Sequence, residues 1–181
     1  IDEIPYDFLR RRLTIFVAGD DAPSQHLIVT KGAFSNVLDI CSSLERDGIE
    51  SPLDAKGRAE LEEVFKAKGA EGFRVLALAT RKVGAKEHHS RDDEQGMTFR
   101  GFLVFYDPPK ADAQRTIRDL NRLGISIKVI SGDNRYVTAH LAEAIGLNAK
   151  SMLTGEDLAT LKDEAMWHLA PRMDLFVGMA R

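Results

Sequence analysis

An antiparallel hairpin is predicted by residues 13–33, which run LTIFVAGDDAPSQHLIVTKGA. Leu13–Val17 and His26–Thr30 are rich in the apolar and β-branched side chains of strands, and Asp20–Ser24 between them has the composition of a turn. Two strands joined by so short a connection pair antiparallel. We therefore expect the first half of the chain to be organised around an antiparallel sheet.

Helices and a further strand follow this hairpin. Apolar residues at 33, 34, 37, 38, 41 and 44 recur at helical spacing and predict one helix that ends at Asp47-Gly48. A second helix is expected near Asp54–Lys68, and a buried strand at Arg74–Ala79. The charged stretch Lys86–Gly96 is expected to be a solvated loop. Antiparallel strands with helices between them describe an α+β module.

The second half has the pattern of a parallel sheet. Phe102–Tyr106 and Ile125–Ile130 are continuous apolar runs, and each precedes a helical pattern that ends at a glycine. Ligands of such sheets bind at the carboxyl ends of the strands, which is where Asp107 and Ser131-Gly132-Asp133 fall. We place the boundary between the two modules near residue 100.

Composition excludes several classes of protein. The 181 residues include 25 Lys and Arg against 28 Asp and Glu, so the net charge of −3 gives no basic surface for nucleic acid. No apolar run approaches the roughly 20 residues that span a bilayer. Cys41 is the single cysteine, which excludes an internal disulfide. The absence of an initiator Met indicates a piece of a longer chain, which we expect to be soluble.

Two segments in the first half suit a nucleotide. In Lys31-Gly32-Ala33, the lysine could reach a phosphate and the glycine would let a ligand approach the backbone. Tyr6 and Phe8 precede the arginine run 10–12; aromatic rings stack on bases with about 1–3 kcal/mol each, and arginines neutralise phosphate. The alternatives are a strand-to-helix turn with an exposed lysine, and an edge strand with a solvated basic face.

A third segment, Ser131-Gly132-Asp133, lies at a predicted strand end in the second half. Its hydroxyl, glycine backbone and carboxylate could hold a phosphoryl group and an associated Mg²⁺. The alternative is a turn in which Asp133 caps the following helix, because Asp and Asn favour that position.

The chain resembles the P-type cation-transporting ATPases from Glu3 to about Gly146, and its opening resembles the magnesium-transporting branch. Five short motifs occur in the family's order: Glu3-Ile4-Pro5-Tyr6-Asp7-Phe8, Lys31-Gly32-Ala33, Arg74-Val75-Leu76-Ala77, Asp107-Pro108-Pro109-Lys110 and Ser131-Gly132-Asp133-Asn134. The resemblance implies an α+β nucleotide-binding domain at residues 1–100. It also implies a partial phosphorylation domain at residues 101–181, with a haloacid-dehalogenase-like parallel α/β sheet.

The same resemblance implies ATP-binding roles in the first domain. Tyr6 would stack on adenine, Lys31 and Gly32 would line the same pocket, and Arg74 would reach the phosphates. Phe8 and Arg11 are added because of their proximity to Tyr6. The list of expected ATP-binding residues is Tyr6, Phe8, Arg11, Lys31, Gly32 and Arg74.

In the second domain, the resemblance implies that Asp107, Ser131, Gly132 and Asp133 flank the phosphoryl and Mg²⁺ site. No catalytic residue is expected in this chain, because the family's phosphorylated Asp lies in an Asp-Lys-Thr-Gly-Thr segment that is absent here. The Gly-Asp-Gly-x-Asn-Asp segment is absent too, and Arg181 receives no role.

Other polar residues are expected to be solvated. Adjacent His88 and His89 lack the spacing of a helical metal pair. Asp92, Asp93 and Glu94 have the character of an exposed acidic stretch.

The resulting hypothesis is an ATP-binding cytosolic fragment of a P-type pump, which uses MgATP and works with the remaining domains of its parent at the cytoplasmic face of a membrane. It would position ATP for phosphoryl transfer to an Asp outside this chain. A stand-alone phosphatase that uses Asp107 or Asp133 as nucleophile is one alternative. Pro108 and Pro109 disfavour it, because they remove backbone donors that a phosphate cradle needs. A nucleotide-independent interaction module is the other alternative.

Overall fold

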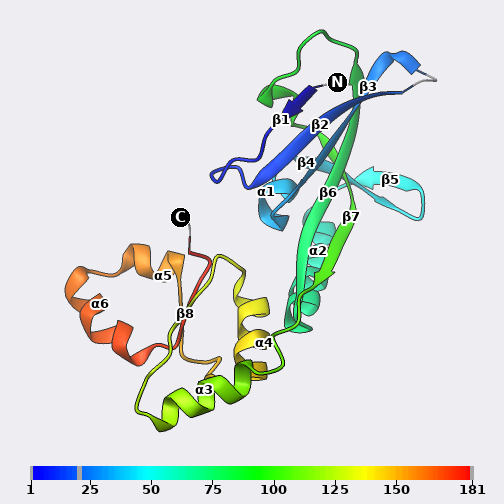
Figure 1. Ribbon diagram of the computed structural model, residues 1–181. Helices are drawn as coiled ribbons and strands as arrows, with labels where there is room; N and C mark the ends of the chain where they lie inside the picture. The colour runs from blue at the N-terminus through cyan, green and yellow to red at the C-terminus, as the bar shows by residue number, and fades with distance from the viewer. Residues whose placement is uncertain (1, 20–21, 180–181) are drawn as a thin grey trace. The chain divides into compact units, whose positions relative to one another are not determined.

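The computed structural model describes residues 2–19 and 22–179, and Figure 1 shows its elements in chain order. The chain divides into two compact units, one formed by Ile1–Phe65 with Val75–Val104 and the other by Lys66–Arg74 with Phe105–Arg181. The strands are β1 Asp2–Ile4, β2 Arg12–Gly19, β3 Ala22–Gly32, β4 Cys41–Arg46, β5 Ile49–Pro52, β6 Phe73–Gly84, β7 Met97–Tyr106, β8 Val129–Ile130, β9 Met152–Thr154 and β10 Leu175–Val177. The α-helices are α1 Phe34–Leu38, α2 Ala55–Ala70, α3 Ala113–Arg122, α4 Arg135–Ile145, α5 Gly155–Thr160 and α6 Asp163–Leu169, and the 3-10 helices are η1 Arg91–Asp93 and η2 Ala170–Arg172.

The first unit contains a seven-stranded sheet in the order β1-β2-β3-β6-β7-β4-β5. The predicted hairpin is confirmed: β2 and β3 pair antiparallel from Arg12 opposite Gly32 to Ala18 opposite His26. Of the expected turn, Asp20 and Asp21 lie outside the described residues. Since β3 also pairs antiparallel with β6, the antiparallel sheet with helices that the sequence predicts is confirmed.

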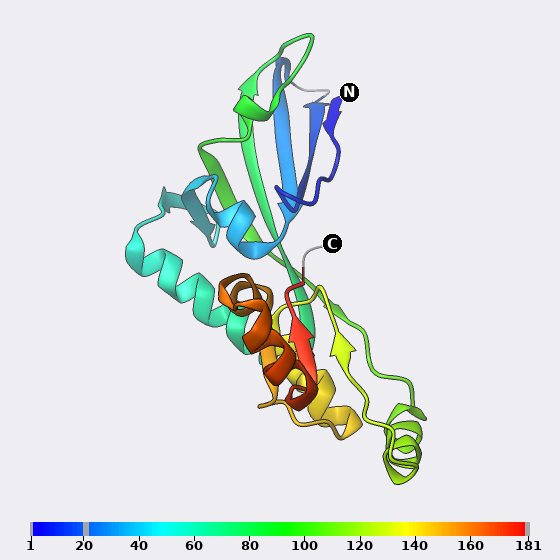
Figure 2. The ribbon, with the colours of Figure 1, turned by 90° about the vertical axis from the view of Figure 1, so that its left-hand side faces the viewer.

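One face of this sheet carries the core. Phe16 and Ile28 on β2 and β3 are buried there, and Phe34 of α1 stacks on Phe65 of α2 with ring centroids 4.8 Å apart. Both helices lie on the same side of the strands, behind them in Figure 1 and to their left in Figure 2. On the other face of β2, Ile15 and Val17 remain 38% and 41% exposed, so this face is only partly covered.

The long helix predicted from residue 33 to 47 is wrong beyond Leu38. Residues Cys41–Arg46 form β4, which pairs with β5 and, in parallel, with β7. Strand residues three apart ordinarily face opposite ways. However, the register against β7 shifts between Cys41 and Ser43, and both Cys41 and Leu44 are buried. This bulge explains why a strand imitates helical spacing.

The second unit contains a small parallel sheet in the order β8-β10-β9. Helices α5 and α6 lie on one side of it and α4 on the other (Figures 1 and 2). The predicted parallel α/β arrangement is therefore confirmed, but its strands differ from the expected ones. Phe102–Tyr106 ends β7 of the large sheet instead of beginning the small one, and of Ile125–Ile130 only Val129–Ile130 finds partners, on β10.

The expectation that Lys86–Gly96 is solvated is wrong for two side chains. Glu94 is fully buried, and the His89 ring is buried against Phe16, stacked at 4.1 Å between centroids. His89 also shares a hydrogen bond of 2.7 Å with His26 of β3. His89 and Glu94 thus attach this segment to the sheet. Its charged composition gives no sign of these buried contacts.

Asp93 of η1 provides a test of the hydrogen bonds within this segment. A hydrogen bond from Lys86, 2.6 Å long, and one from the Ser90 N–H lower the pKa of Asp93 to about 2. A lowered pKa contributes stability above the ordinary value of 3.8, and this contribution is lost as the pH falls toward 2. We expect Lys86→Gln to move the pKa of Asp93 up toward 3.8, measured by NMR titration of the carboxyl carbon.

Lys82→Gln, which removes an exposed lysine of β6, is the control and should leave this titration unchanged. A pKa of Asp93 near 3.8 in the unmodified chain would contradict the hydrogen bonds from Lys86 and Ser90.

Candidate functional site

A tight turn places the aromatic residues of the opening segment. The Asp7 carboxylate accepts hydrogen bonds from the N–H groups of Leu9 and Arg10, at 3.0 and 2.6 Å, and the Asp7 carbonyl accepts one from the Arg11 N–H at 2.8 Å. The Arg10 backbone bond, followed by the Arg10 side chain, holds the pKa of Asp7 below its usual value. Around this turn, Tyr6 and Phe8 are 51% and 71% exposed and meet edge to face at 5.6 Å.

Behind the turn lies a buried carboxylate. Glu94 is fully buried and accepts two hydrogen bonds from Arg10, at 2.8 and 2.7 Å, and one from Arg12 at 3.1 Å. The Thr14 hydroxyl of β2 donates a further bond of 2.5 Å. Burial by itself would raise the pKa of Glu94, but the bonds from Thr14 and Arg10 and the charge of Arg12 outweigh it and lower that pKa.

The predicted phosphate-binding turn touches the arginine run directly. The Ala33 N–H donates to the Arg11 carbonyl at 2.9 Å, and a Cβ added to Gly32 would clash with that carbonyl and lie 2.6 Å from the Arg12 Cα. Arg11 itself has a φ of 48°, a strained value for arginine. The sequence predicts that Gly32 makes room for a ligand. In the structure, Gly32 makes room for the backbone of Arg11 and Arg12.

Lys31 precedes this contact at the end of β3. Its Cα partners are Leu13 on β2 and Leu78 on β6, and its side chain is exposed. The structure thus brings Tyr6, Phe8 and Arg11 onto one turn and joins that turn to Gly32, the neighbour of Lys31. Lys31 therefore places a positive charge at the end of β3, next to the apolar residues Leu13 and Leu78 on the neighbouring strands.

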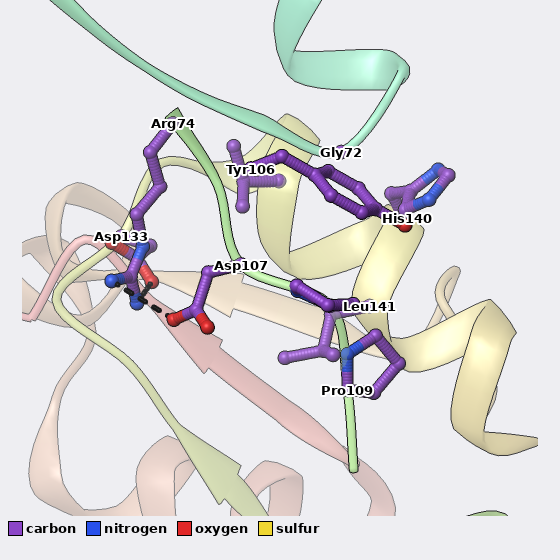
Figure 3. Close-up of a pocket in the computed structure, with 10 residues that line it drawn as sticks. Gly72, Arg74, Tyr106, Asp107, Pro109, Asp133, His140 and Leu141 are labelled. Carbon is purple, nitrogen blue, oxygen red and sulfur yellow. Dashed lines mark hydrogen bonds and ion pairs between the residues drawn. The ribbon is translucent and has the colours of Figure 1, made fainter. Parts of the chain in front are cut away.

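Arg74 belongs to a second group of residues, which Figure 3 shows in close-up. Its guanidinium pairs with Asp133 at 2.9 Å and with Asp107 at 3.4 Å. Asp107 follows the end of β7 directly, and Asp133 follows the end of β8 by three residues. These three side chains share a pocket of about 190 Å³ with Tyr106, His140 and the two prolines after Asp107.

The segment Ser131–Asn134 forms a tight connection between β8 and α4. The Ser131 N–H donates to the Phe176 carbonyl at 2.8 Å, and the Ser131 hydroxyl accepts from the Asp133 N–H at 3.1 Å. Asn134, not Asp133, caps α4: its side chain accepts from the N–H groups of Tyr136 and Val137. The helix-cap alternative is therefore wrong for Asp133, and its carboxylate pairs with Arg74 instead.

The chemistry open to this pocket follows from its charge and size. Arg74, Asp107 and Asp133 are exposed by 52%, 69% and 33%, so their ion pairs are worth about 0–1 kcal/mol and can rearrange. Two carboxylates against one guanidinium leave hard oxygen ligands of the kind that Mg²⁺ prefers. A volume of about 190 Å³ is below the roughly 300–1,000 Å³ of pockets that enclose drug-sized ligands. The pocket thus suits a phosphoryl group better than a nucleoside.

Within residues 2–19 and 22–179, no cluster of three or more His, Cys, Asp or Glu side chains has the geometry of a metal centre. Of the four residues expected to flank the phosphoryl and Mg²⁺ site, Asp107 and Asp133 pair with the same guanidinium group. Ser131 and Gly132 form the turn that precedes Asp133.

Sequence reasoning missed Glu94 and the inward roles of Arg10 and Arg12. A signal for them exists in β2 and β3, where Thr14 and Thr30 occupy facing inward positions next to Phe16 and Ile28 and are both fully buried. Their hydroxyls bond to each other at 2.8 Å. Buried polar side chains need partners, and two threonines at facing inward positions indicate a polar group from elsewhere in the chain.

Comparison with known proteins agrees with these features. The family model described as "P-type ATPase, cytoplasmic domain N" matches residues 1–112. Magnesium-transporting ATPase, P-type 1, of Escherichia coli strain K12 is 36% identical over 180 residues, which is 99% of this chain and 20% of that protein. Calcium-transporting ATPase of Bacillus subtilis strain 168 is 27% identical over 183 residues, 99% of this chain and 20% of that protein.

Calcium-transporting ATPase 1 of Yarrowia lipolytica is 30% identical over 172 residues, which is 92% of this chain. The chain spans about a fifth of the length of these relatives. Among the helices of the described residues, none is both long and apolar enough to cross a membrane.

The packing of Gly32 against Arg11 and Arg12 predicts the effect of a single methyl group. In Gly32→Ala, the new Cβ meets backbone that cannot rotate away, so we expect a loss of about 1–3 kcal/mol in the free energy of unfolding. Chemical denaturation measures this loss.

Gly84→Ala is the matched control. Gly84 also lies in a strand of the same sheet, but a Cβ there meets no atom within 4 Å, so stability should change little. Equal stabilities of the two variants would show that Arg11 and Arg12 do not pack on Gly32 in this way.

Proposed function

Since the chain belongs to the P-type ATPase family, we propose that it binds ATP and positions it for phosphoryl transfer to an aspartate outside this chain. Residues 1–100 are the nucleotide-binding domain, and residues 101–181 are part of the phosphorylation domain. The parent is an ATP-driven cation pump, and this piece works at the cytoplasmic face of the membrane with the pump's remaining domains.

The observation that carries this proposal is the pair of exposed rings on a rigid turn. Large aromatic side chains that are 51% and 71% exposed, as Tyr6 and Phe8 are, offer free faces for a purine. The Asp7 hydrogen bonds hold the turn that presents them, so little conformational entropy is lost on binding. Tyr6 stacks on the adenine, and Phe8 supports it through their edge-to-face contact.

The cationic residues then meet the phosphates. Lys31 is exposed at the end of β3, and Arg11 has no side-chain partner within the described part of the chain. Both therefore offer a full positive charge to an anion. Arg74 belongs to the second unit, where its weak surface pairs with Asp107 and Asp133 let it exchange a carboxylate for a phosphate.

In the partial phosphorylation domain, Asp107, Ser131, Gly132 and Asp133 flank the phosphoryl group and the Mg²⁺ that accompanies it. The carboxylates supply oxygen ligands, and Ser131 supplies a hydroxyl. Mg²⁺ arrives with ATP, and it neutralises the charge that develops on the phosphate oxygens. Asp107 is not itself the nucleophile, because the two residues that follow it are prolines without N–H donors for a phosphate.

Magnesium is the proposed transported ion. Its support is the 36% identity to magnesium-transporting ATPases over 99% of this chain, against 27–30% for the calcium-transporting relatives.

Titration of the chain with MgATP tests the nucleotide site. We expect NMR shifts at Tyr6, Lys31 and Arg74, and weaker binding by about tenfold in Lys31→Ala, because a hydrogen bond to a charged group contributes roughly 1.5–3 kcal/mol. The free energy of unfolding should stay within about 0.5 kcal/mol of that of the unmodified chain, since Lys31 is exposed.

Lys82→Ala removes another exposed strand lysine of the same unit and should leave the affinity unchanged. The absence of shifts at millimolar MgATP would refute ATP binding. Equal effects of the two lysine variants would refute the role of Lys31.

A further inference from the structure

Glu94 is a buried carboxylate to which the proposed function assigns no task. We propose that Glu94 is a positioning residue for the nucleotide: it draws Arg10 and Arg12 inward and thereby fixes the turn that presents Tyr6, Phe8 and Arg11. This inference rests on the proposed function.

The contacts of Glu94 divide the arginine run into two kinds of residue. Arg10 and Arg12 keep only 13% and 15% of their side chains exposed, and both pair with Glu94, at 2.7 and 3.0 Å. Arg12 also donates to the Asn36 carbonyl at 3.1 Å, and Arg10 bonds to Asp7. Two of the three guanidinium groups are therefore occupied inside the protein, and Arg11 is the one that remains for a ligand.

Glu94 also connects the turn to the sheet. Its bond from Thr14, and the bond between Thr14 and Thr30, tie it to β2 and β3. Arg10 in turn joins Glu94 to Asp7, the residue whose carboxylate shapes the turn. A continuous chain of hydrogen bonds thus runs from the buried sheet to Asp7, in the turn that carries the two exposed rings.

Removal of the negative charge should release this chain of contacts. Without the Glu94 charge, Arg12 has no carboxylate partner and Arg10 keeps only Asp7, so both guanidinium groups become costly to keep buried, and long arginine side chains can extend to water. As Arg10 leaves, Asp7 loses its hydrogen-bonded side-chain partner and keeps only the ion pair with Arg91 at 3.7 Å, so the aromatic pair loses its fixed presentation. At the same time, two more cations become available to phosphate.

These two effects act on different parts of a nucleotide, and this difference gives the proposal its test. Adenosine reports on the aromatic contact alone, whereas MgATP also reports on the cations. In Glu94→Gln we expect adenosine to bind about tenfold more weakly, as is typical when an outer supporting partner is lost. The affinity for MgATP should fall less, so that the preference for MgATP over adenosine rises.

The experiment is NMR titration of the full chain with adenosine and with MgATP, at a temperature where each variant shows a folded spectrum. Leu44→Ala is the matched control: Leu44 is buried on β4, at 4% exposure, so this variant is destabilised without any change near Glu94. Its affinities for both probes should equal those of the unmodified chain.

The outcomes separate the two proposals. If the unmodified chain binds neither probe, the proposed function fails. If it binds both, and folded Glu94→Gln binds them with unchanged affinity or loses affinity only as Leu44→Ala does, the positioning role is overturned. Should Glu94→Gln fail to fold, Thr14→Val replaces it, because it removes one donor and leaves the arginine pairs. It should weaken adenosine binding about threefold, and an unchanged affinity would overturn the role.

Discussion

The burial of the Glu94 carboxylate is the constraint on which the first unit depends. A buried charge is tolerated only where opposite charges and hydrogen bonds compensate it. Here Arg10, Arg12 and Thr14 provide the compensation, and they come from a turn and a strand that lie 80 to 84 residues away in sequence. The carboxylate therefore determines where the opening turn lies on the sheet, and with it the position of Tyr6 and Phe8.

Close backbone packing completes the same arrangement. Gly32 lets the Arg11–Arg12 backbone approach β3, and the Ala33 N–H bonds to the Arg11 carbonyl at the point of contact. The sheet then presents two different faces. One is filled by the helices and the segment around Glu94, while the other keeps partly exposed apolar residues beside Lys31. An apolar surface that ends at a cation suits a ligand with an aromatic base and a charged tail.

The second unit follows a different principle. Its polar side chains, Asp107 and Asp133, are positioned because they follow the ends of strands β7 and β8, and they remain partly exposed. Because Asn134 takes the cap of α4, Asp133 remains available to Arg74, and Asp107 is brought to the same guanidinium from the end of β7. Exposed ion pairs of this kind are weak and exchangeable. That weakness is useful where a phosphate and its metal ion must enter and leave.

The sequence by itself determined the elements whose signals are local. The hairpin of β2 and β3, helix α2 and the glycine-ended helix α4 follow from side-chain spacing and capping residues, and the order of the short motifs was sufficient for the family. Only the tertiary structure decided β4, because a bulge placed Cys41 and Leu44 on one face and imitated a helix. It also decided the burial of Glu94 and His89, since a charge is buried only when partners distant in sequence arrive to compensate it, and no local pattern records them.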